Sequence, residues 1–324
     1  MQNPTTSECI RGALYGLAAV SIWAGFIVVA RLGLRTSLTP WDIAAVRFAV
    51  AGSLLLPYVM SKGVALERLG WIGLAAIVIG CGAPMVMLAN VGLVFAPAAH
   101  AGALFPGVMP LMVAILAAAI LKEPFTSRKW VGFVLIVMGG IGIVWGTGGT
   151  IGTVQNVGHM FFLAAGLAWA CYTVAMRRAR LDGLHAAAIA AVVSLALYLP
   201  AYAYIAGTSI FEAPLSDIAL QAIVQGFLTG IIALLLYGRM VSILGASSAA
   251  AFVALTPAMT ALMAIPILGE WPSAIDCMAI ALISIGVYVV SGRPAARAAR
   301  LSARIGVRSH GGGAGRGSGP QGPV

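Results

Sequence analysis

Charged residues are scarce in this chain. Only 9% of its 324 residues are Asp, Glu, Lys or Arg, and 61% are hydrophobic, whereas soluble domains contain about 25% charged residues. This composition excludes an ordinary soluble protein. Apolar runs of about 20 residues recur between Gly12 and Gly292, and a helix of that length crosses a bilayer core of ~30 Å. We therefore expect an all-α polytopic membrane protein.

Motifs of soluble enzymes and metal sites are also missing. The four cysteines are scattered without a CxxC pair, so they predict neither a metal site nor a disulfide framework. HExxH and GxSxG motifs are absent, and no Asp or Glu falls near the centre of an apolar run. An active site needs a convergent set of such groups. We expect no enzyme activity, no metal and no cofactor, with a membrane-embedded enzyme or an assembly factor as the alternative.

Hydropathy and helix breakers divide the apolar part of the chain into ten predicted spans. Only the short segment 95–100 separates the third span from the fourth. A continuous helix of about 50 residues would be far too long for a bilayer, so we place two spans there, with a single broken span as the alternative. The spans cover residues 12–30, 42–61, 71–93, 98–121, 130–147, 158–176, 185–206, 218–238, 246–268 and 274–292.

The basic residues indicate the orientation of these spans. Of the 19 Lys and Arg residues, 16 fall on one side of the ten-span topology, Arg31 and Arg35 fall on the other, and Arg47 lies inside a span. Loops rich in Lys and Arg remain in the cytoplasm, so both termini are expected there. The net charge of +10 therefore reflects topology, and no nucleic-acid partner is expected.

The chain contains an internal repeat. Shifts of 146 or 147 residues align its two halves and match Trp, Pro and Glu residues that are uncommon in this composition. Each copy holds five helices, an odd number, so the second copy must cross the membrane upside down. Inverted repeats of this kind are typical of secondary transporters. The matched pairs include Trp23/Trp169, Arg31/Arg177, Pro110/Pro257, Glu123/Glu270 and Gly139/Gly286.

The repeat divides the chain into five parts. They are a cytoplasmic N-terminus (1–11), a first five-helix repeat (12–147), a linker (148–157), a second five-helix repeat (158–292) and a basic, Gly-rich cytoplasmic tail (293–324).

Taken in order, these motifs resemble a known family. Each half begins with a helix that contains Trp, the second helix carries an Arg in "WDIAAVRFAVAG", and each fourth helix has a Pro midway and ends at a Glu. Over residues 12–292 this pattern resembles the EamA family of the drug/metabolite transporter superfamily. The resemblance implies a bacterial inner-membrane carrier, expected to be an exporter, for small metabolites such as amino acids or related compounds. The carrier would work by alternating access around a central cavity between the repeats.

Seven side chains are candidates for this cavity, which we expect helices 1, 3, 4, 6, 8 and 9 to line. Arg47 is the only basic residue well inside a span, where a charge costs at least about 2.5 kcal/mol, so it should face the interior. Alternatively it is an anchor that pairs with Asp42 or extends to the membrane surface. The aromatic and amide candidates suit either an apolar binding site or helix packing. The seven are Trp23, Arg47, Asn90, Trp169, Tyr172, Gln225 and Tyr237.

Proline and glutamate mark the fourth helix of each half. Pro110 and Pro257 each remove a backbone donor and are expected to kink the helix, either for gating or as fixed packing kinks. Glu123 and Glu270 end these helices on opposite faces of the membrane, so they cannot share a catalytic site. Each is expected to tie the following loop or to latch a gate.

Coupling and partners stay open at this point. His100, at the start of the fourth span, is either a proton relay or a polar group with an ordinary hydrogen-bond partner. Proton-driven carriers commonly hold a carboxylate at membrane depth, whereas the carboxylates nearest to the spans fall at span ends, so facilitated diffusion is as credible as proton antiport. These carboxylates are Asp42, Glu123, Asp217, Glu270 and Asp276. The Arg-rich tail is either a site for anionic lipid or a plain cytoplasmic retention signal. Expected partners are a small-molecule substrate and membrane lipids, with the protein a monomer or homodimer.

Overall fold

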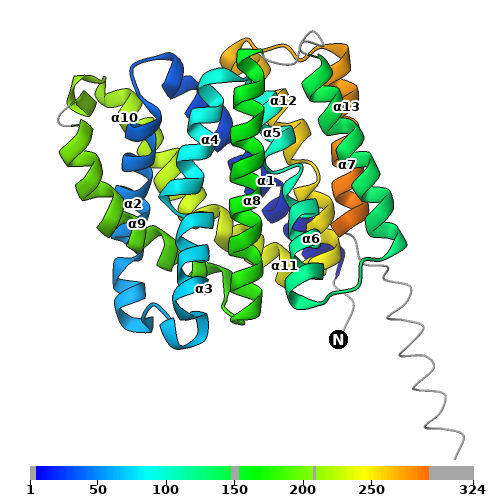
Figure 1. Ribbon diagram of the computed structural model, residues 1–324, viewed down its shortest axis with the longest axis horizontal. Coiled ribbons are helices and arrows are strands. Elements are labelled where there is room, and N and C mark those ends of the chain that lie inside the picture. Colours follow the sequence, from blue (N-terminus) through cyan, green and yellow to red (C-terminus); the bar gives the residue numbers. More distant parts are fainter. Residues whose placement is uncertain (1–4, 147–152, 207–208, 292–324) are drawn as a thin grey trace, which may run out of the picture.

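In the part of the chain that the structure describes, ten helical segments are long and apolar enough to cross a membrane, as the sequence predicts. The computed structural model describes residues 5–146, 153–206 and 209–291, and the Arg-rich tail and the first half of the linker lie outside these ranges. The first half contains α1 (Thr6–Arg35), α2 (Pro40–Lys62), α3 (Leu66–Cys81), α4 (Ala83–Phe95), α5 (Ala98–Leu104), α6 (Met109–Leu121) and α7 (Ser127–Gly146). The second contains α8 (Val154–Arg178), α9 (Gly183–Ala206), η1 (Ser209–Glu212), α10 (Leu215–Gln221), η2 (Ala222–Ile232), α11 (Ala233–Val253), α12 (Thr256–Leu268) and α13 (Ala274–Ser291) (Figure 1).

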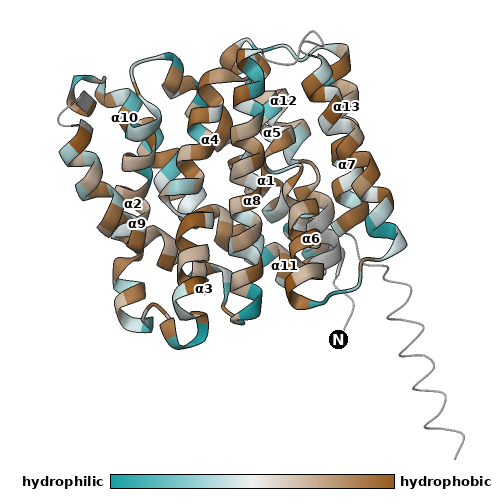
Figure 2. Cartoon of the chain, viewed as in Figure 1, coloured by the Kyte–Doolittle hydropathy of each residue, from teal (hydrophilic) through white to brown (hydrophobic). Residues whose placement is uncertain are grey.

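The outer surface of the bundle is apolar. Trp71, Ile72 and Ile205 are 74%, 89% and 82% exposed. Figure 2 shows hydrophobic residues along most of the length of the helices and hydrophilic residues mainly near their ends. Such side chains would be unfavourable in water but are well solvated by lipid tails, so the exposed apolar surface is the one that faces the bilayer.

The two halves are arranged as inverted five-helix repeats. Equivalent helices meet directly, since α7 packs on α13 and α2 packs on α9. Contacts between different helices also come in matched sets: α1 packs on α12 of the other repeat, and α8, the equivalent of α1, packs on α6. Every major interface therefore joins one repeat to the other. We call the end of the bundle at which α1 begins the N-terminal face, and the opposite end the linker face.

Glycines allow α7 and α13 to pack closely. A Cβ atom at Gly139 would lie 2.7 Å from the carbonyl oxygen of Ala279, and one at Gly286 would lie 3.0 Å from that of Gly132. Small residues at such positions bring membrane helices together because burial of apolar surface does not drive association in lipid. The repeated pair Gly139/Gly286 thus has a packing reason.

Both third spans are irregular near mid-depth. In the first repeat, α3 and α4 are separated at Gly82, and the backbone N–H of Ala83 donates a 3.0 Å hydrogen bond to Ser194 Oγ. In the second repeat, η2 is an eleven-residue π-helix. A shift of 147 moves Gly82 onto Thr229, which lies inside η2. The same part of each repeat therefore departs from α-helical geometry.

The fourth spans are broken where the sequence predicts kinks. Non-helical turns separate α5 from α6 at residues 105–108 and α11 from α12 at residues 254–255. Pro110 and Pro257 lie in the first turn of α6 and α12, where a missing backbone N–H costs no hydrogen bond. The interruption is therefore a break that comes before the proline.

The ends of α6 and α12 are alike in backbone conformation. Each helix ends at a left-handed residue, Lys122 with φ 58° and Gly269 with φ 67°. This conformation stops the helix and turns the chain, which places Glu123 and Glu270 directly after the turn. Glycine adopts it freely, whereas lysine has a steric cost because of its Cβ atom.

Candidate functional site

A cavity of about 130 Å³ lies between the two repeats. Its walls come from α1, α2, α3, α4, α6 and the turn at residues 105–108 of the first repeat, and from α8, α9, η2, α11 and α12 of the second. The second and seventh spans therefore contribute in addition to the six that the sequence suggested. Most of the lining is apolar or aromatic. The polar side chains that line it are those of Arg47, Asn90, Gln225, Thr229 and Thr256, with Cys81, Tyr172 and the indoles of Trp23 and Trp169.

Six of the seven candidate residues meet in this cavity. Trp169 and Tyr172 lie on one side with ring centroids 5.2 Å apart. The seventh candidate, Tyr237, does not line the cavity but packs against Trp23 at a centroid distance of 5.2 Å. The structure therefore brings together residues from spans that are far apart in the chain.

Arg47 carries the positive charge of the cavity. It is only 9% exposed, it donates a 3.2 Å hydrogen bond from Nη1 to Gln225 Oε1, and its guanidinium lies 5.6 Å from the ring centroid of Phe26. Asp42 does not pair with it, because that carboxylate accepts hydrogen bonds from Thr39 and Tyr202. Among the described residues no carboxylate lies within ion-pair distance of Arg47. The guanidinium therefore has donors available and no counter-ion in the described part of the chain.

The amide groups of the cavity are held by backbone oxygens. Asn90 Nδ2 donates to the carbonyl of Pro40 at 3.3 Å, and Gln225 Nε2 donates to that of Phe26 at 2.8 Å. Gln225 therefore fixes Arg47 through one end of its amide and α1 through the other. Gln225 lies in the π-helix η2. Segments of π-helix are rare and frequently occur at functional sites.

Thr229 and Thr256 are cavity residues that the sequence did not suggest. Both are buried; the hydroxyl of Thr229 donates to the carbonyl of Val224 in η2, and that of Thr256 donates to the carbonyl of Val253 at the end of α11. Threonine inside an apolar run gives no distinctive signal, because its hydroxyl is commonly satisfied by the helix backbone. Only the packing of the spans shows that these two face the cavity.

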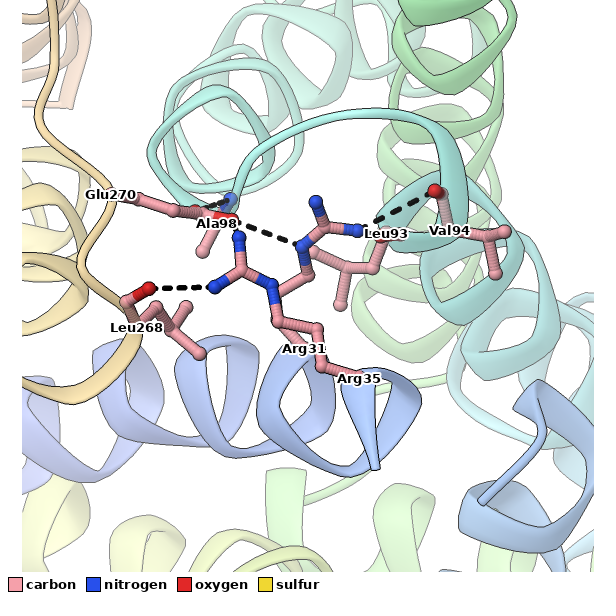
Figure 3. A network of polar contacts seen from close by, with 7 residues as sticks. All are labelled: Arg31, Arg35, Leu93, Val94, Ala98, Leu268 and Glu270. Atoms are coloured by element: carbon pink, nitrogen blue, oxygen red, sulfur yellow. Dashed lines mark hydrogen bonds and ion pairs between the residues drawn. The ribbon is translucent and has the colours of Figure 1, made fainter. Parts of the chain in front are cut away.

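Glu270 forms an ion-pair network at the linker face (Figure 3). Its Oε1 accepts hydrogen bonds from Arg31 Nε at 3.0 Å and from Arg35 Nη2 at 2.6 Å, and its Oε2 accepts one from the backbone N–H of Ala98 at 2.8 Å. The carboxylate is 11% exposed. The arginines also donate to backbone oxygens, Arg31 to Leu93 and Arg35 to Leu268. We call Glu270, Arg31, Arg35 and Ala98 the Glu270 network.

Glu123 forms the equivalent network at the N-terminal face. Its carboxylate pairs with Arg177 and, at 3.9 Å, with Lys129. This carboxylate is 31% exposed, so its pairing is weaker than that of Glu270. We call Glu123, Arg177 and Lys129 the Glu123 network.

The two networks join the repeats crosswise. Arg31 of the first repeat pairs with Glu270 of the second, whereas Arg177 of the second pairs with Glu123 of the first. The sequence revealed that both residue types are repeated, but it did not reveal that they pair with each other. The sequence did contain a clue to this pairing, because the arginines and the glutamates each fall near helix ends at matching positions of the two repeats. The two carboxylates lie at opposite ends of the bundle.

No arrangement of metal ligands accompanies these features. Within the described residues, no three His, Cys, Asp or Glu side chains are grouped as a metal site would require.

A ten-helix bundle made of two inverted repeats, with a cavity between them and ion pairs at either end, has the architecture of a secondary transporter. Similarity to known proteins agrees with this class. A model of the EamA-like transporter family matches residues 10–145 and 156–292, one match for each repeat. The chain belongs to this family and is a multi-pass membrane protein.

Two known proteins illustrate the similarity. The uncharacterized transporter YyaM of Bacillus subtilis (strain 168) is 26% identical over 267 residues, which is 78% of this chain and 85% of that protein. A solved crystal structure has the same fold, with a TM-score of 0.58 and 20% identity, over 90% of this chain and 98% of that one.

Proposed function

We propose that this protein is a carrier that exports small metabolites bearing a carboxylate, such as amino acids or related compounds, by alternating access. The observation that carries the proposal is the unneutralised Arg47 guanidinium in an aromatic cavity between the repeats. The description of the family and the name of the Bacillus relative, a transporter, support transport in place of an enzymatic role.

The chemistry of the cavity favours one anionic group on an otherwise apolar or amphipathic solute. A solute carboxylate would supply the counter-ion that Arg47 lacks, and an Arg–carboxylate pair is strong when both groups are shielded from water. The indoles of Trp23 and Trp169 offer flat apolar surfaces with one N–H donor each. A solute with several phosphates would require more than one cationic side chain.

Alternating access would require one network to break at a time. Because the Glu270 and Glu123 networks tie the two repeats together at opposite ends, opening the cavity to one side means separating the residues of the network on that side. The broken third and fourth spans would provide the bending points, as discontinuous helices do in other transporters.

We place the protein in a bacterial inner membrane, as a monomer or homodimer, with the N-terminal face in the cytoplasm. The excess of Lys and Arg on that face supports this orientation. A cysteine introduced by Gly149→Cys in the linker should react with an impermeant maleimide added to the periplasm of intact cells. Labelling only after the cells are opened would reverse the orientation.

Transport is tested by flux in proteoliposomes with a panel of labelled amino acids, with and without a pH gradient. Removing a charged hydrogen bond costs about 1.5–3 kcal/mol, so Arg47→Gln should raise the KM roughly 10- to 150-fold. Arg47→Lys keeps the charge and should lose less. Arg239→Gln, which removes an exposed arginine at the N-terminal face, is the matched control. Absence of flux for every solute tested would refute the carrier, and unchanged kinetics in Arg47→Gln would refute the role of the guanidinium.

A further inference from the structure

Three titratable side chains form a buried hydrogen-bonded row near the linker face. His100 of α5 lies between His159 of α8 and Asp276 of α13. The Nδ1 atom of His100 is 3.0 Å from His159 Nε2, and its Nε2 atom is 3.2 Å from Asp276 Oδ1. The three residues are 4%, 2% and 8% exposed. They bond to one another in line and do not converge on a common point as metal ligands would.

This row is not a product of the internal duplication. The same shifts that match the two networks move His100 onto Ser247, Asp276 onto Lys129 and His159 onto Ala13. Serine and alanine do not titrate near neutral pH, and lysine is a cation where Asp276 is an anion, so these three residues cannot form the same row. The row at the linker face therefore has no counterpart at the repeat-equivalent positions, whereas an ion-pair network is present on both faces.

The row can hold one additional proton without moving a heavy atom. When both histidines are uncharged and Asp276 is a carboxylate, His100 Nε2–H donates to Asp276 and His159 Nε2–H donates to His100 Nδ1. This arrangement leaves His159 Nδ1 as an acceptor without a hydrogen. Within the described residues, His159 Nδ1 is buried without a hydrogen-bond partner. When a proton binds there and the bridging hydrogen moves from His159 to His100, His100 becomes an imidazolium beside the Asp276 carboxylate. Histidine is the side chain that changes charge most readily between pH 5 and 8.

The surroundings connect the row to the Glu270 network. A hollow of about 150 Å³ is lined by His100, Asp276 and Glu270, and these are its only titratable lining residues in the part of the chain described. Glu270 is neutralised by Arg31 and Arg35, while Asp276 Oδ2 accepts hydrogen bonds from Ser273 at the start of α13. From α8, the only titratable group that faces His100 is His159.

The first residues of α5 are consequently held by two carboxylates of the second repeat. Ala98 donates to Glu270, and His100 two residues later bonds to Asp276. Both contacts cross the boundary between the repeats at the linker face. A change in the charge of His100 therefore changes one of the attachments that keep this face closed.

We propose that His100, His159 and Asp276 form a proton-binding site that strengthens closure of the linker face when it is protonated. With both histidines uncharged, the row has a net charge of −1 from Asp276, and binding of one proton brings its net charge to zero by creating an imidazolium–carboxylate pair. A charge-assisted hydrogen bond is roughly twice as strong as a neutral one. Loss of the proton weakens the attachment of α5 to α13 and favours opening. The coupling to transport rests on the carrier function proposed above, whereas proton binding itself does not.

The proton site is tested directly by nitrogen-15 NMR of histidine-labelled full-length protein in lipid nanodiscs between pH 5 and 8. The chain has only four histidines, so each can be assigned by single substitution. We expect His100 and His159 to take up one proton jointly. Asp276→Asn, which retains a capping side chain for α13, should weaken proton binding at least tenfold. His185→Gln is the control, since His185 Nε2 bonds to the Gly63 carbonyl at the other end of the bundle.

A second measurement tests the coupling. In proteoliposomes, the pH dependence of flux for a transported amino acid should be lost in His159→Gln and retained in His185→Gln. If neither His100 nor His159 titrates between pH 5 and 8, or if Asp276→Asn has no effect on their titration, the proton site is refuted. Titration without a change in the pH dependence of flux refutes the coupling. Titration without flux of any solute leaves the proton site standing and refutes the carrier.

Discussion

Replacing Glu270 with glutamine removes the charge of the carboxylate at the centre of the Glu270 network while nearly preserving its shape. Two guanidinium groups and one backbone N–H point at this carboxylate at 2.6 to 3.0 Å. In Glu270→Gln, Arg31 and Arg35 lose their counter-ion, and the amide presents one acceptor oxygen where the carboxylate had two. Glu123→Gln makes the same chemical change at the other end of the bundle.

The expected magnitudes differ because the two carboxylates differ in burial and in partners. Breaking a fully buried ion pair costs about 3–5 kcal/mol. Glu270 is 11% exposed but Arg35 is 40% exposed, so we expect a loss of roughly 2–4 kcal/mol in the free energy of unfolding. Glu123 is 31% exposed, with one partner at 3.9 Å, so Glu123→Gln should cost at most about 1 kcal/mol.

Unfolding of the purified protein in mixed micelles, followed by tryptophan fluorescence, would measure both free energies. A double-mutant cycle of Glu270→Gln with Arg31→Gln should give a coupling energy above about 1 kcal/mol, since the two groups are in direct contact. Equal losses in Glu270→Gln and Glu123→Gln, or additive effects in the cycle, would show that the Glu270 network does not hold the repeats together.

Two further predictions concern the backbone. Gly139→Ala should destabilise the protein by about 1–3 kcal/mol through overpacking against α13, whereas Gly140→Ala, whose Cβ would meet nothing closer than 3.8 Å, should be nearly neutral. Equal thermal stability of the two variants would contradict the close α7–α13 contact. Lys122→Gly should stabilise the protein by about 0.5–1 kcal/mol because φ is 58° there, and Gly269→Ala should destabilise it by a similar amount. A loss of stability in Lys122→Gly, measured in the same unfolding assay, would contradict the left-handed conformation of that residue.

The sequence identified most residues of the candidate site, but it did not indicate how they are arranged around the cavity. Arg47 and the two central tryptophans were identifiable because a charge or an indole inside an apolar span has few favourable places except the protein interior. Tyr237 was expected to line the cavity, but it packs against Trp23 and is not a lining residue. The π-helix that carries Gln225 and Thr229 was not predictable, because its sequence, "AIVQGFLTGII", has the composition of any apolar helix.

The sequence alone determined the ten spans, their division into two halves and the inversion of the second half. The physical reason is that each span must match the thickness of the bilayer and that an odd number of helices reverses the repeat. Only the tertiary structure decided that Arg31 pairs with Glu270 and Arg177 with Glu123, and that His100, His159 and Asp276 meet. These contacts join helices far apart in the chain, and which helices meet depends on the packing of the spans across the bundle, to which hydropathy is insensitive.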